Sequence, residues 1–196
     1  MSETSTSDVA ASRKRPFAPF IAGAVGVVLV AFLGLLAFAN PGGTDSAESP
    51  LLGKPAPEVK STLIDGGNFD LARRKGSWVV LNFFNSTCVP CRQEHPLLVD
   101  FAAEQKTSDD QVEMYTVVND DSDAAVKAYF ASNGGDWGKV RDDDGAISVA
   151  FGVAKVPESW VIDPDGFVRM RVIGALSEGF LTARLDELKR QYSGQS

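Results

Sequence analysis

An apolar run that leads into the chain's only two cysteines limits most strongly how this sequence can fold. Residues 78–84 (WVVLNFF) are almost continuously apolar, and Cys88 and Cys91 follow them as a C-x-x-C pair. Such a run is typical of a central strand buried on both faces. Apolar side chains recur with helical spacing from about residue 89 to residue 105. The sequence therefore predicts a strand, a turn and a helix that begins at the cysteines.

The position of the two cysteines points to chemistry rather than to structural support. A disulfide between cysteines so close in sequence closes too small a loop to constrain the unfolded chain much. At a helix N-terminus, the helix dipole and free backbone N–H groups lower the pKa of a thiol. We therefore predict that Cys88 is the nucleophile and that Cys91, one turn further on, resolves the mixed disulfide. Pro90 fixes φ between them.

Other uses of the cysteine pair fit the sequence less well. A zinc site needs four ligands, whereas the chain offers two cysteines and one histidine, His95. Haem attachment requires a histidine where this chain has Arg92. The acidic residues around 120–123 and 142–144 lack the spacing of a calcium loop and predict solvated turns and helix caps. We expect no metal and no cofactor besides the Cys88–Cys91 disulfide, and two inert buried cysteines are the remaining alternative.

The N-terminal part of the chain has the pattern of a membrane anchor. Residues 17–39 contain no charged side chain and are longer than the roughly 20 residues that a helix needs to cross a bilayer. The basic cluster at residues 13–15 precedes them, so the positive-inside rule places a tail of residues 1–16 in the cytoplasm. We expect a signal-anchor, single-pass in the cell membrane, with an extracytoplasmic catalytic domain. A signal peptide cleaved near residues 37–39 is the alternative, and it leaves the cysteines in the same compartment.

Composition divides the remainder into a linker and one domain. Residues 40–51 are polar and rich in Gly, Ser and Pro, which predicts a flexible linker. Residues 52–192 suit one globular domain. The net charge of the chain is -7, and the acidic excess lies after residue 39. An acidic domain repels nucleic-acid phosphates, so we expect no binding to nucleic acid.

Turn residues and hydrophobic periodicity predict a mixed α/β order. Besides the segments above, we expect strands at 59–63 and 112–118, and helices at 122–132 and 176–192, the first of them capped by Ser122. The D-P-D-G turn at 163–166 separates apolar runs at 158–162 and 167–173, which predicts an antiparallel hairpin. Strands separated by helices and then joined in a hairpin imply a central mixed sheet with helices on both faces.

Several separated motifs resemble one known family. The stretch VVLNFFNSTCVPCRQEHPLL (residues 79–98) is similar to the active-site stretch of membrane-anchored, extracytoplasmic thioredoxin-like proteins of the CcmG/DsbE/ResA/TlpA family. The segment GKPAP (residues 53–57) resembles the opening of these domains, and GVAKVPE (residues 152–158) resembles their G-V-x-x-x-P-E segment. The resemblance covers about residues 52–190. It implies a thioredoxin fold, preceded here by one N-terminal transmembrane helix.

The resemblance implies roles for residues on both sides of the expected disulfide. Cys88 matches the attacking cysteine and Cys91 the resolving cysteine. Pro157 matches the cis-proline that thioredoxin folds place beside the disulfide. A cis bond there leaves the backbone of Val156 free to pair with a client strand. An ordinary trans proline at the start of a strand is the alternative.

Further residues near the cysteines follow from the same comparison. Val89 and Pro90, between the cysteines, are expected to contact the client together with Val156 and Pro157. Glu94 matches an acidic residue that tunes the cysteines or moves protons. A solvated glutamate that suits a helix N-terminus is the other interpretation.

Three positions depart from the general thioredoxin pattern or bear on it. Thr87 replaces the tryptophan that the family usually carries before the first cysteine, which affects client contact. Asn82 occupies the strand position where general thioredoxins have a buried aspartate, so no proton shuttle is expected there. His95 lies beside Glu94, and we expect it at the surface, with a role as a base as the alternative.

The resemblance implies a thiol–disulfide oxidoreductase that reduces protein disulfides in cytochrome c biogenesis. The client would be apocytochrome c, whose C-x-x-C-H must be reduced before haem attachment, and a membrane thiol reductase would donate the electrons. An oxidase or isomerase of secreted proteins stays open, because the C-V-P-C motif does not decide the direction. A non-catalytic thioredoxin-fold binding module is the alternative from another class. A thiol peroxidase would need a peroxidatic cysteine of its own, and the chain has no third cysteine.

Overall fold

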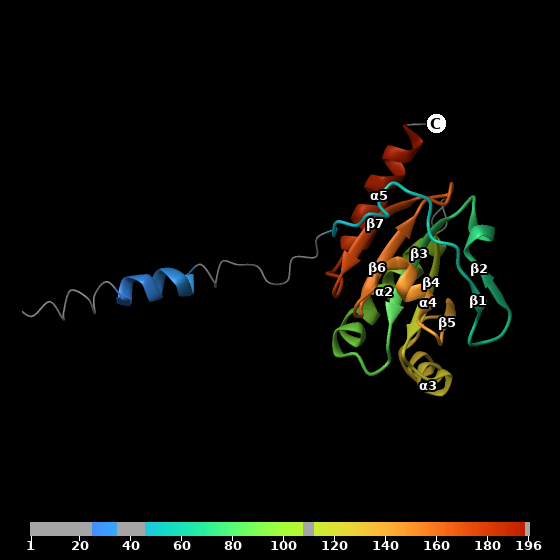
Figure 1. Ribbon diagram of the computed structural model, residues 1–196, viewed down its shortest axis with the longest axis horizontal. Helices are drawn as coiled ribbons and strands as arrows, with labels where there is room; N and C mark the ends of the chain where they lie inside the picture. Colours follow the sequence, from blue (N-terminus) through green and yellow to red (C-terminus); the bar gives the residue numbers. More distant parts are fainter. Residues whose placement is uncertain (1–24, 35–45, 108–111, 195–196) are drawn as a thin grey trace, which may run out of the picture. The chain divides into compact units, whose positions relative to one another are not determined.

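The computed structural model describes residues 25–34, 46–107 and 112–194, whose elements are shown in Figure 1. The chain divides into two compact units, Met1–Gly42 and Gly43–Ser196.

The described part of the first unit is a short apolar helix. Residues 25–34 are helical, and their large apolar side chains are exposed. Among the described residues, no helix is long and apolar enough to cross a membrane. The predicted tail, residues 1–16, and both ends of the predicted anchor, residues 17–24 and 35–39, lie outside the described part of the chain.

A mixed five-stranded sheet forms the centre of the second unit (Figure 1). In spatial order its strands are β5 (Gly138–Asp142), β4 (Val112–Asn119), β3 (Trp78–Phe84), β6 (Glu158–Ile162) and β7 (Val168–Ile173). The pairs β3–β4 and β4–β5 are parallel, whereas β3–β6 and β6–β7 are antiparallel. This arrangement confirms the predicted thioredoxin-type sheet.

Helices and short elements cover both faces of the sheet. They are β1 (Lys60–Thr62), β2 (Asn68–Asp70), η1 (Leu71–Arg74), α2 (Val89–Lys106), α3 (Asp123–Asn133), α4 (Ala146–Phe151) and α5 (Phe180–Ser193). Successive side chains of a strand point to opposite faces, so β3 contributes to two separate hydrophobic clusters. Val80 and Phe84 pack with α2, α3 and α5, whereas Leu81 and Phe83 pack with β2, η1 and α4. The whole of β3 is buried, as its apolar sequence predicts.

The structure also contains elements that the sequence patterns did not predict, and its closing helix begins later than predicted. The strands β2 and β5, the turn η1 and the short helix α4 were not expected, because each is short and has no strong periodicity of its own. The closing helix begins at Phe180 rather than near residue 176. Its start is delayed because the backbone N–H of Leu176 donates to the Glu94 carboxylate and because Gly179 has a φ of 70°.

The N-terminal segment of the second unit lies along β7, the last strand of the sheet. The N–H groups of Ala47 and Gly53 donate to the carbonyls of Arg171 and Val168 over 2.7 and 2.8 Å. An edge strand leaves backbone groups unpaired, and these bonds satisfy some of them. Part of the predicted linker, residues 46–51, is described beside β7, whereas residues 40–45 lie outside the described part.

Because β3 is buried on both faces, substitution of its side chains tests the described core. Leu81 is 0% exposed, so Leu81→Ala is expected to lower the free energy of unfolding by about 2–5 kcal/mol. The control is Val149→Ala at a side chain that is 79% exposed, which should change stability by less than about 0.5 kcal/mol. Urea unfolding followed by circular dichroism measures both. Equal effects of the two variants would contradict the described core.

Candidate active site

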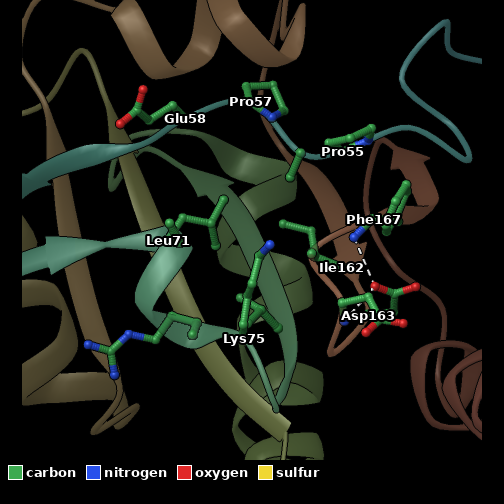
Figure 2. A pocket seen from close by; sticks show the side chains of 14 residues that line it. Pro55, Pro57, Glu58, Leu71, Lys75, Ile162, Asp163 and Phe167 are labelled. Atoms are coloured by element: carbon green, nitrogen blue, oxygen red, sulfur yellow. Dashed lines mark hydrogen bonds between the residues drawn. The ribbon is translucent and has the colours of Figure 1, made fainter.

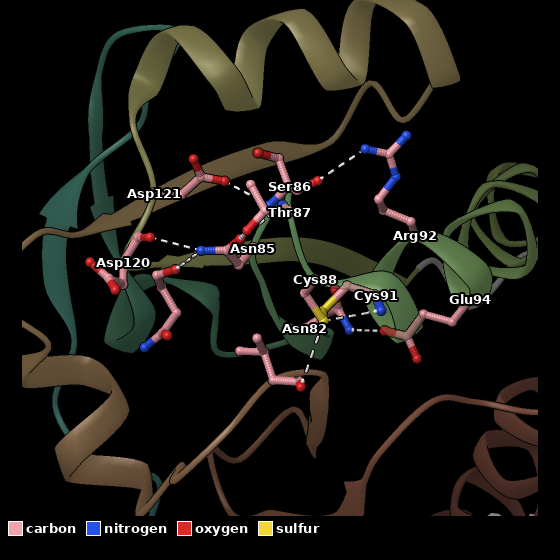
Figure 3. Close-up of a disulfide and its surroundings, with 12 residues drawn as sticks. Asn82, Asn85, Ser86, Thr87, Cys88, Cys91, Arg92, Glu94, Asp120 and Asp121 are labelled. Carbon is pink, nitrogen blue, oxygen red and sulfur yellow. Dashed lines mark hydrogen bonds between the residues drawn. A yellow bond between two sulfur atoms is a disulfide. The ribbon is translucent and has the colours of Figure 1, made fainter.

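The two cysteines lie where β3 leads into α2, and they form a disulfide with the Cα atoms 5.3 Å apart (Figure 3). Cys88 is the N-cap residue of α2, and its sulfur accepts the backbone N–H of Cys91 at 3.2 Å. Cys91 is completely buried, whereas Cys88 is partly exposed. The strand, turn and helix predicted from the sequence are therefore present, and only one of the two sulfurs is open to another molecule.

This position favours the thiolate form of Cys88 when the disulfide is reduced. The N–H group of Cys91 points at the Cys88 sulfur, and an 18-residue helix directs the positive end of its dipole toward it. Pro90 lies in the first turn of α2, where a proline costs no hydrogen bond. Val89 and Pro90 are both exposed beside the disulfide, which is compatible with the client contact predicted for them.

A second segment, distant in sequence, meets the disulfide. The peptide bond between Val156 and Pro157 is cis, as predicted. The Val156 carbonyl oxygen lies 3.7 Å from the Cys88 sulfur, although 68 positions separate the two residues. We call residues 152–158 the cis-proline loop. The loop is brought there because β6 pairs with β3, with Glu158 opposite Phe83.

Glu94 is buried behind the disulfide on the second turn of α2. The side chain is 1% exposed, which excludes the solvated glutamate that the sequence left as an alternative. Its carboxylate accepts the side-chain amide of Asn82 at 2.9 Å and the backbone N–H of Leu176 at 2.8 Å (Figure 3 shows the contact with Asn82). Burial raises the pKa of Glu94 to about 7, although both hydrogen bonds favour the charged form.

Asn82 links Glu94 to the strand that follows the cis-proline. Its amide nitrogen also donates to the Ser159 hydroxyl at 3.0 Å. The amide oxygen of Asn82 is buried and has no hydrogen-bond partner among the described residues. An amide does not titrate, so Asn82 orients Glu94 rather than carrying a proton. The sequence reasoning did not find Ser159 or this link, although a polar residue inside the apolar run of β3 is a signal for a buried partner.

The expectation that His95 lies at the surface is wrong. The side chain is 1% exposed, and its Nε2 atom lies 3.0 Å from the Gly134 carbonyl oxygen. Phe130 and Tyr129 of α3 pack edge-on against the ring, with centroids 4.9 and 5.0 Å away. Burial lowers the pKa of His95. The physical reason is that α2 is covered by α3, so His95 points into that contact while its neighbour Glu94 points toward the sheet.

Acidic and amide side chains hold the loop that precedes Cys88 (Figure 3). The Asp121 carboxylate accepts the Ser86 N–H at 2.6 Å, and the Asn85 amide donates to the carbonyls of Asn119 and Asp120. The acidic cluster at 120–123 was predicted only as a turn and cap, and its role in this loop was missed. Within the residues that the structure describes, no three His, Cys, Asp or Glu side chains are grouped as metal ligands.

A pocket of about 290 Å³ lies at the other end of β6, away from the disulfide (Figure 2). Its wall is formed by Leu71, Ile162 and Phe167, with Lys75 crossing it and Asp163 at one side. Asp163 follows the end of β6, whereas Glu158 and the cis-proline loop are at its start. The pocket is therefore separate from the redox site.

The difference in burial between the sulfurs predicts a difference in reactivity. After reduction, iodoacetamide should modify the Cys91→Ser variant, which keeps Cys88, roughly 10–100-fold faster than the Cys88→Ser variant. Mass spectrometry of timed samples measures the rates. Both variants should react at similar rates in guanidinium chloride, since unfolding exposes either thiol. A faster reaction of Cys91 in the native chain would contradict the assigned order of attack.

Burial of Glu94 also predicts how stability depends on pH. The unperturbed pKa is 4.5 and the folded value is about 7, so the folded chain binds more protons between these values. Stability therefore falls as the pH rises through this window. Between pH 4.5 and 7.5 the free energy of unfolding should fall by about 2–3 kcal/mol less in Glu94→Gln than in the parent chain. Urea unfolding of the oxidised chain at the two pH values measures the difference. Asp100→Asn, at an exposed position of the same helix, is the control for removing a carboxyl group from α2. An unaltered dependence in Glu94→Gln would refute the raised pKa.

Comparison with known proteins agrees with this geometry. The model of the Redoxin family matches residues 51–188. The thiol:disulfide interchange protein HelX of Rhodobacter capsulatus is 30% identical over 83% of this chain and 91% of its own length. The thiol-disulfide oxidoreductase ResA of Bacillus anthracis is 32% identical over 68% of this chain and 79% of its own length.

Solved structures show the same fold. The structure of MTB DsbF in its mixed oxidized and reduced forms is 26% identical, with a TM-score of 0.62, and covers 68% of this chain and 98% of that one. A secreted Mycobacterium tuberculosis disulfide oxidoreductase homologous to E. coli DsbE is 23% identical, with a TM-score of 0.60 over 66% of this chain and 95% of that one. The second likeness bears on the fold alone.

Proposed function

The chain belongs to the Redoxin family and, within it, to the thioredoxin-like CcmG/DsbE/ResA group of thiol–disulfide oxidoreductases, and from this premise we propose that it reduces protein disulfides in cytochrome c maturation. The client would be the C-x-x-C-H segment of apocytochrome c. The observation that carries the proposal is the pairing of one accessible sulfur, Cys88, with one buried sulfur, Cys91, beside a cis-proline loop.

The reaction proceeds by two exchanges between sulfur atoms. The Cys88 thiolate attacks the client disulfide, so that a Cys88–client bond forms and the client S–S bond breaks, releasing one client thiolate. The Cys91 thiolate then attacks the Cys88 sulfur, which re-forms the internal disulfide and releases the second client thiolate. The client gains two electrons and two protons, and the chain loses them. A membrane thiol reductase would return the electrons, and no cofactor besides the disulfide is needed.

Glu94 would take the proton from Cys91 in the second exchange. Its carboxyl group lies one helical turn from Cys91 and has a pKa of about 7, so it can hold or release a proton near neutral pH. The amide of Asn82 keeps one carboxylate oxygen in place. Water has little access to this acid, because both Cys91 and Glu94 are buried.

The client would pair with the backbone of Val156 while its disulfide meets Cys88. The Val156 carbonyl oxygen lies beside the Cys88 sulfur, and an extended client segment can add to such a backbone edge. Val89 and Pro90, between the two cysteines, are exposed and would contact the same segment. Thr87, which is small and exposed, leaves the approach open where the family usually has an indole.

The chain would act outside the cytoplasm, held in the cell membrane by residues 17–39. The support for this proposal is the uncharged length of that segment and the basic cluster at residues 13–15 before it. In an oxidising compartment client cysteines pair spontaneously, so a reductant is needed before haem can be attached.

The direction of electron flow is tested by the redox potential of the Cys88–Cys91 pair. The full chain in detergent micelles is equilibrated with dithiothreitol or glutathione buffers, and the oxidised fraction is measured by alkylation and mass spectrometry. We expect a potential near or below about -230 mV, toward the thioredoxin end of the known range. The reduced chain should also reduce a synthetic peptide that contains a C-x-x-C-H disulfide.

Variants assign the two exchanges in the same assay. Cys88→Ser should abolish peptide reduction, whereas Cys91→Ser should accumulate a mixed disulfide with the peptide. A potential near about -120 mV would make the chain an oxidant of secreted proteins and would refute the proposed direction. Full biological activity of Cys88→Ser in cells would instead identify a binding module that does not use its cysteines.

A further inference from the structure

One arginine holds both ends of the cis-proline loop. The guanidinium of Arg171, on β7, donates to the two carboxylate oxygens of Glu158 at 2.9 and 3.1 Å, and to the Gly152 carbonyl at 3.3 Å. Gly152 begins the loop and Glu158 ends it. The Glu158 side chain is 2% exposed and that of Arg171 is 15% exposed. A charged pair this well buried is held in one geometry and has little freedom to rearrange.

The same arginine also holds the N-terminal segment. A further guanidinium nitrogen of Arg171 donates to the Glu48 carbonyl at 3.2 Å, and the Arg171 carbonyl accepts the Ala47 N–H at 2.7 Å. The guanidinium lies over the ring of Trp160, 5.2 Å from its centroid. Three segments therefore meet at Arg171: the segment that leads toward the predicted anchor, the start of the loop and the end of the loop.

The loop held in this way is the one that faces the disulfide. Val156, inside the loop, places its carbonyl oxygen 3.7 Å from the Cys88 sulfur. The carbonyl of Pro157 accepts the Gly174 N–H at 2.9 Å, so the residue that follows β7 holds the loop at a further point. A shift of Gly152 or Glu158 would move Val156 relative to Cys88, because only a few residues lie between the two fixed ends.

We propose that Arg171 is a positioning residue for client binding, which sets the backbone of Val156 and couples its placement to the N-terminal segment, residues 46–50. Arg171 contacts neither sulfur atom in the described contacts, so it acts on client affinity through the loop rather than on sulfur chemistry. This inference rests on the proposed function, because it assumes that a client docks along Val156.

The arrangement requires arginine rather than any cation. A planar guanidinium presents five N–H groups in a fixed fork, which serves the Glu158 carboxylate and two separate carbonyls at once. A lysine ammonium keeps the charge opposite Glu158 but cannot reach the same three partners in one geometry. Arg171→Lys therefore weakens the contacts with Gly152 and Glu48, while the buried carboxylate of Glu158 keeps a positive charge opposite it.

The neighbouring arginine on the same strand offers a matched control. Arg169 lies two residues earlier on β7, where the pairing with β6 is irregular. Its side chain lies beside Trp78 and Tyr192, away from the cis-proline loop. Its guanidinium pairs with the fully buried carboxylate of Asp163 and lies 5.8 Å from the centroid of the Phe167 ring. Asp163 holds the turn after β6, at the opposite end of that strand from the cis-proline loop. Arg169→Lys thus disturbs a similar ion pair without touching the loop.

The test compares two disulfide substrates with the full chain in detergent micelles. One is the oxidised C-x-x-C-H peptide, which has a backbone to dock, and the other is bis(2-hydroxyethyl) disulfide, which has none. Arg171→Lys should raise KM for the peptide about fivefold or more and leave kcat and the rate with the small disulfide within about twofold. Arg169→Lys should leave all three within about twofold.

A third variant tests the coupling to the N-terminal segment without disturbing the buried pair. Ala47→Pro removes the N–H that donates to the Arg171 carbonyl, at a position that is only partly buried. It should raise KM for the peptide about two- to threefold with kcat unchanged. An unchanged KM in Arg171→Lys, or an equal rise in Arg169→Lys, would overturn the positioning role. An unchanged KM in Ala47→Pro alone would overturn the coupling.

Hydrogen exchange decides the positioning role independently of the client. Backbone amides of residues 152–156 and Glu158 should exchange about tenfold faster in Arg171→Lys than in the parent chain, and at the parent rate in Arg169→Lys. Failure of the parent chain to reduce the peptide would count against the proposed function. The exchange rates would still support or overturn the control of the loop by Arg171, so the two failures are distinguishable.

Discussion

Antiparallel pairing of β3 with β6 brings the two halves of the redox site together. In this register Phe83 lies opposite Glu158, so the C-terminal end of β3 and the start of β6 lie side by side at the same end of the sheet. Cys88 follows β3 and Pro157 immediately precedes β6, which places the cis-proline loop against the exposed sulfur. The pairing is stable because β3 is buried on both faces and hydrogen-bonded on both sides. Displacement of either strand would separate the sulfur from the loop.

Helix α2 then determines how the disulfide is surrounded. Cys91 and Glu94, one turn apart, both point toward the sheet, whereas His95 points toward α3. Burial of a carboxyl group raises its pKa unless charge or hydrogen bonds compensate, and the two bonds that reach Glu94 compensate only in part. The site therefore holds an acid that titrates near neutral pH behind the buried sulfur. That property depends on packing, because an exposed glutamate at the same position of α2 would be charged.

The outer strand β7 connects this site to the N-terminal segment. An unpaired edge strand invites pairing, and here residues of the same chain occupy the edge. The guanidinium of Arg171 on β7 contacts the N-terminal segment, the cis-proline loop and the buried Glu158 together. Arg171 thus connects the start of the domain with the loop that faces the disulfide, in addition to the backbone hydrogen bonds along β7. The pocket beside Asp163 lies at the other end of β6 and takes no part in this connection.

Local patterns in the sequence determined β3, α2, the hairpin of β6 and β7, and the cysteines at the helix start, because each depends on neighbours in the chain. Pro157 could be recognised only by resemblance, since nothing near it in the sequence indicates a cis bond. The weakly patterned β5 and α4 were missed. The burial of Glu94, the inward direction of His95 and the junction at Arg171 came only from the tertiary structure. Each of these rests on contacts between segments distant in sequence, such as Glu94 with Leu176 and Arg171 with Glu48. The periodicity of a sequence indicates which face of a helix or strand is apolar, but it does not indicate which other segment will cover that face.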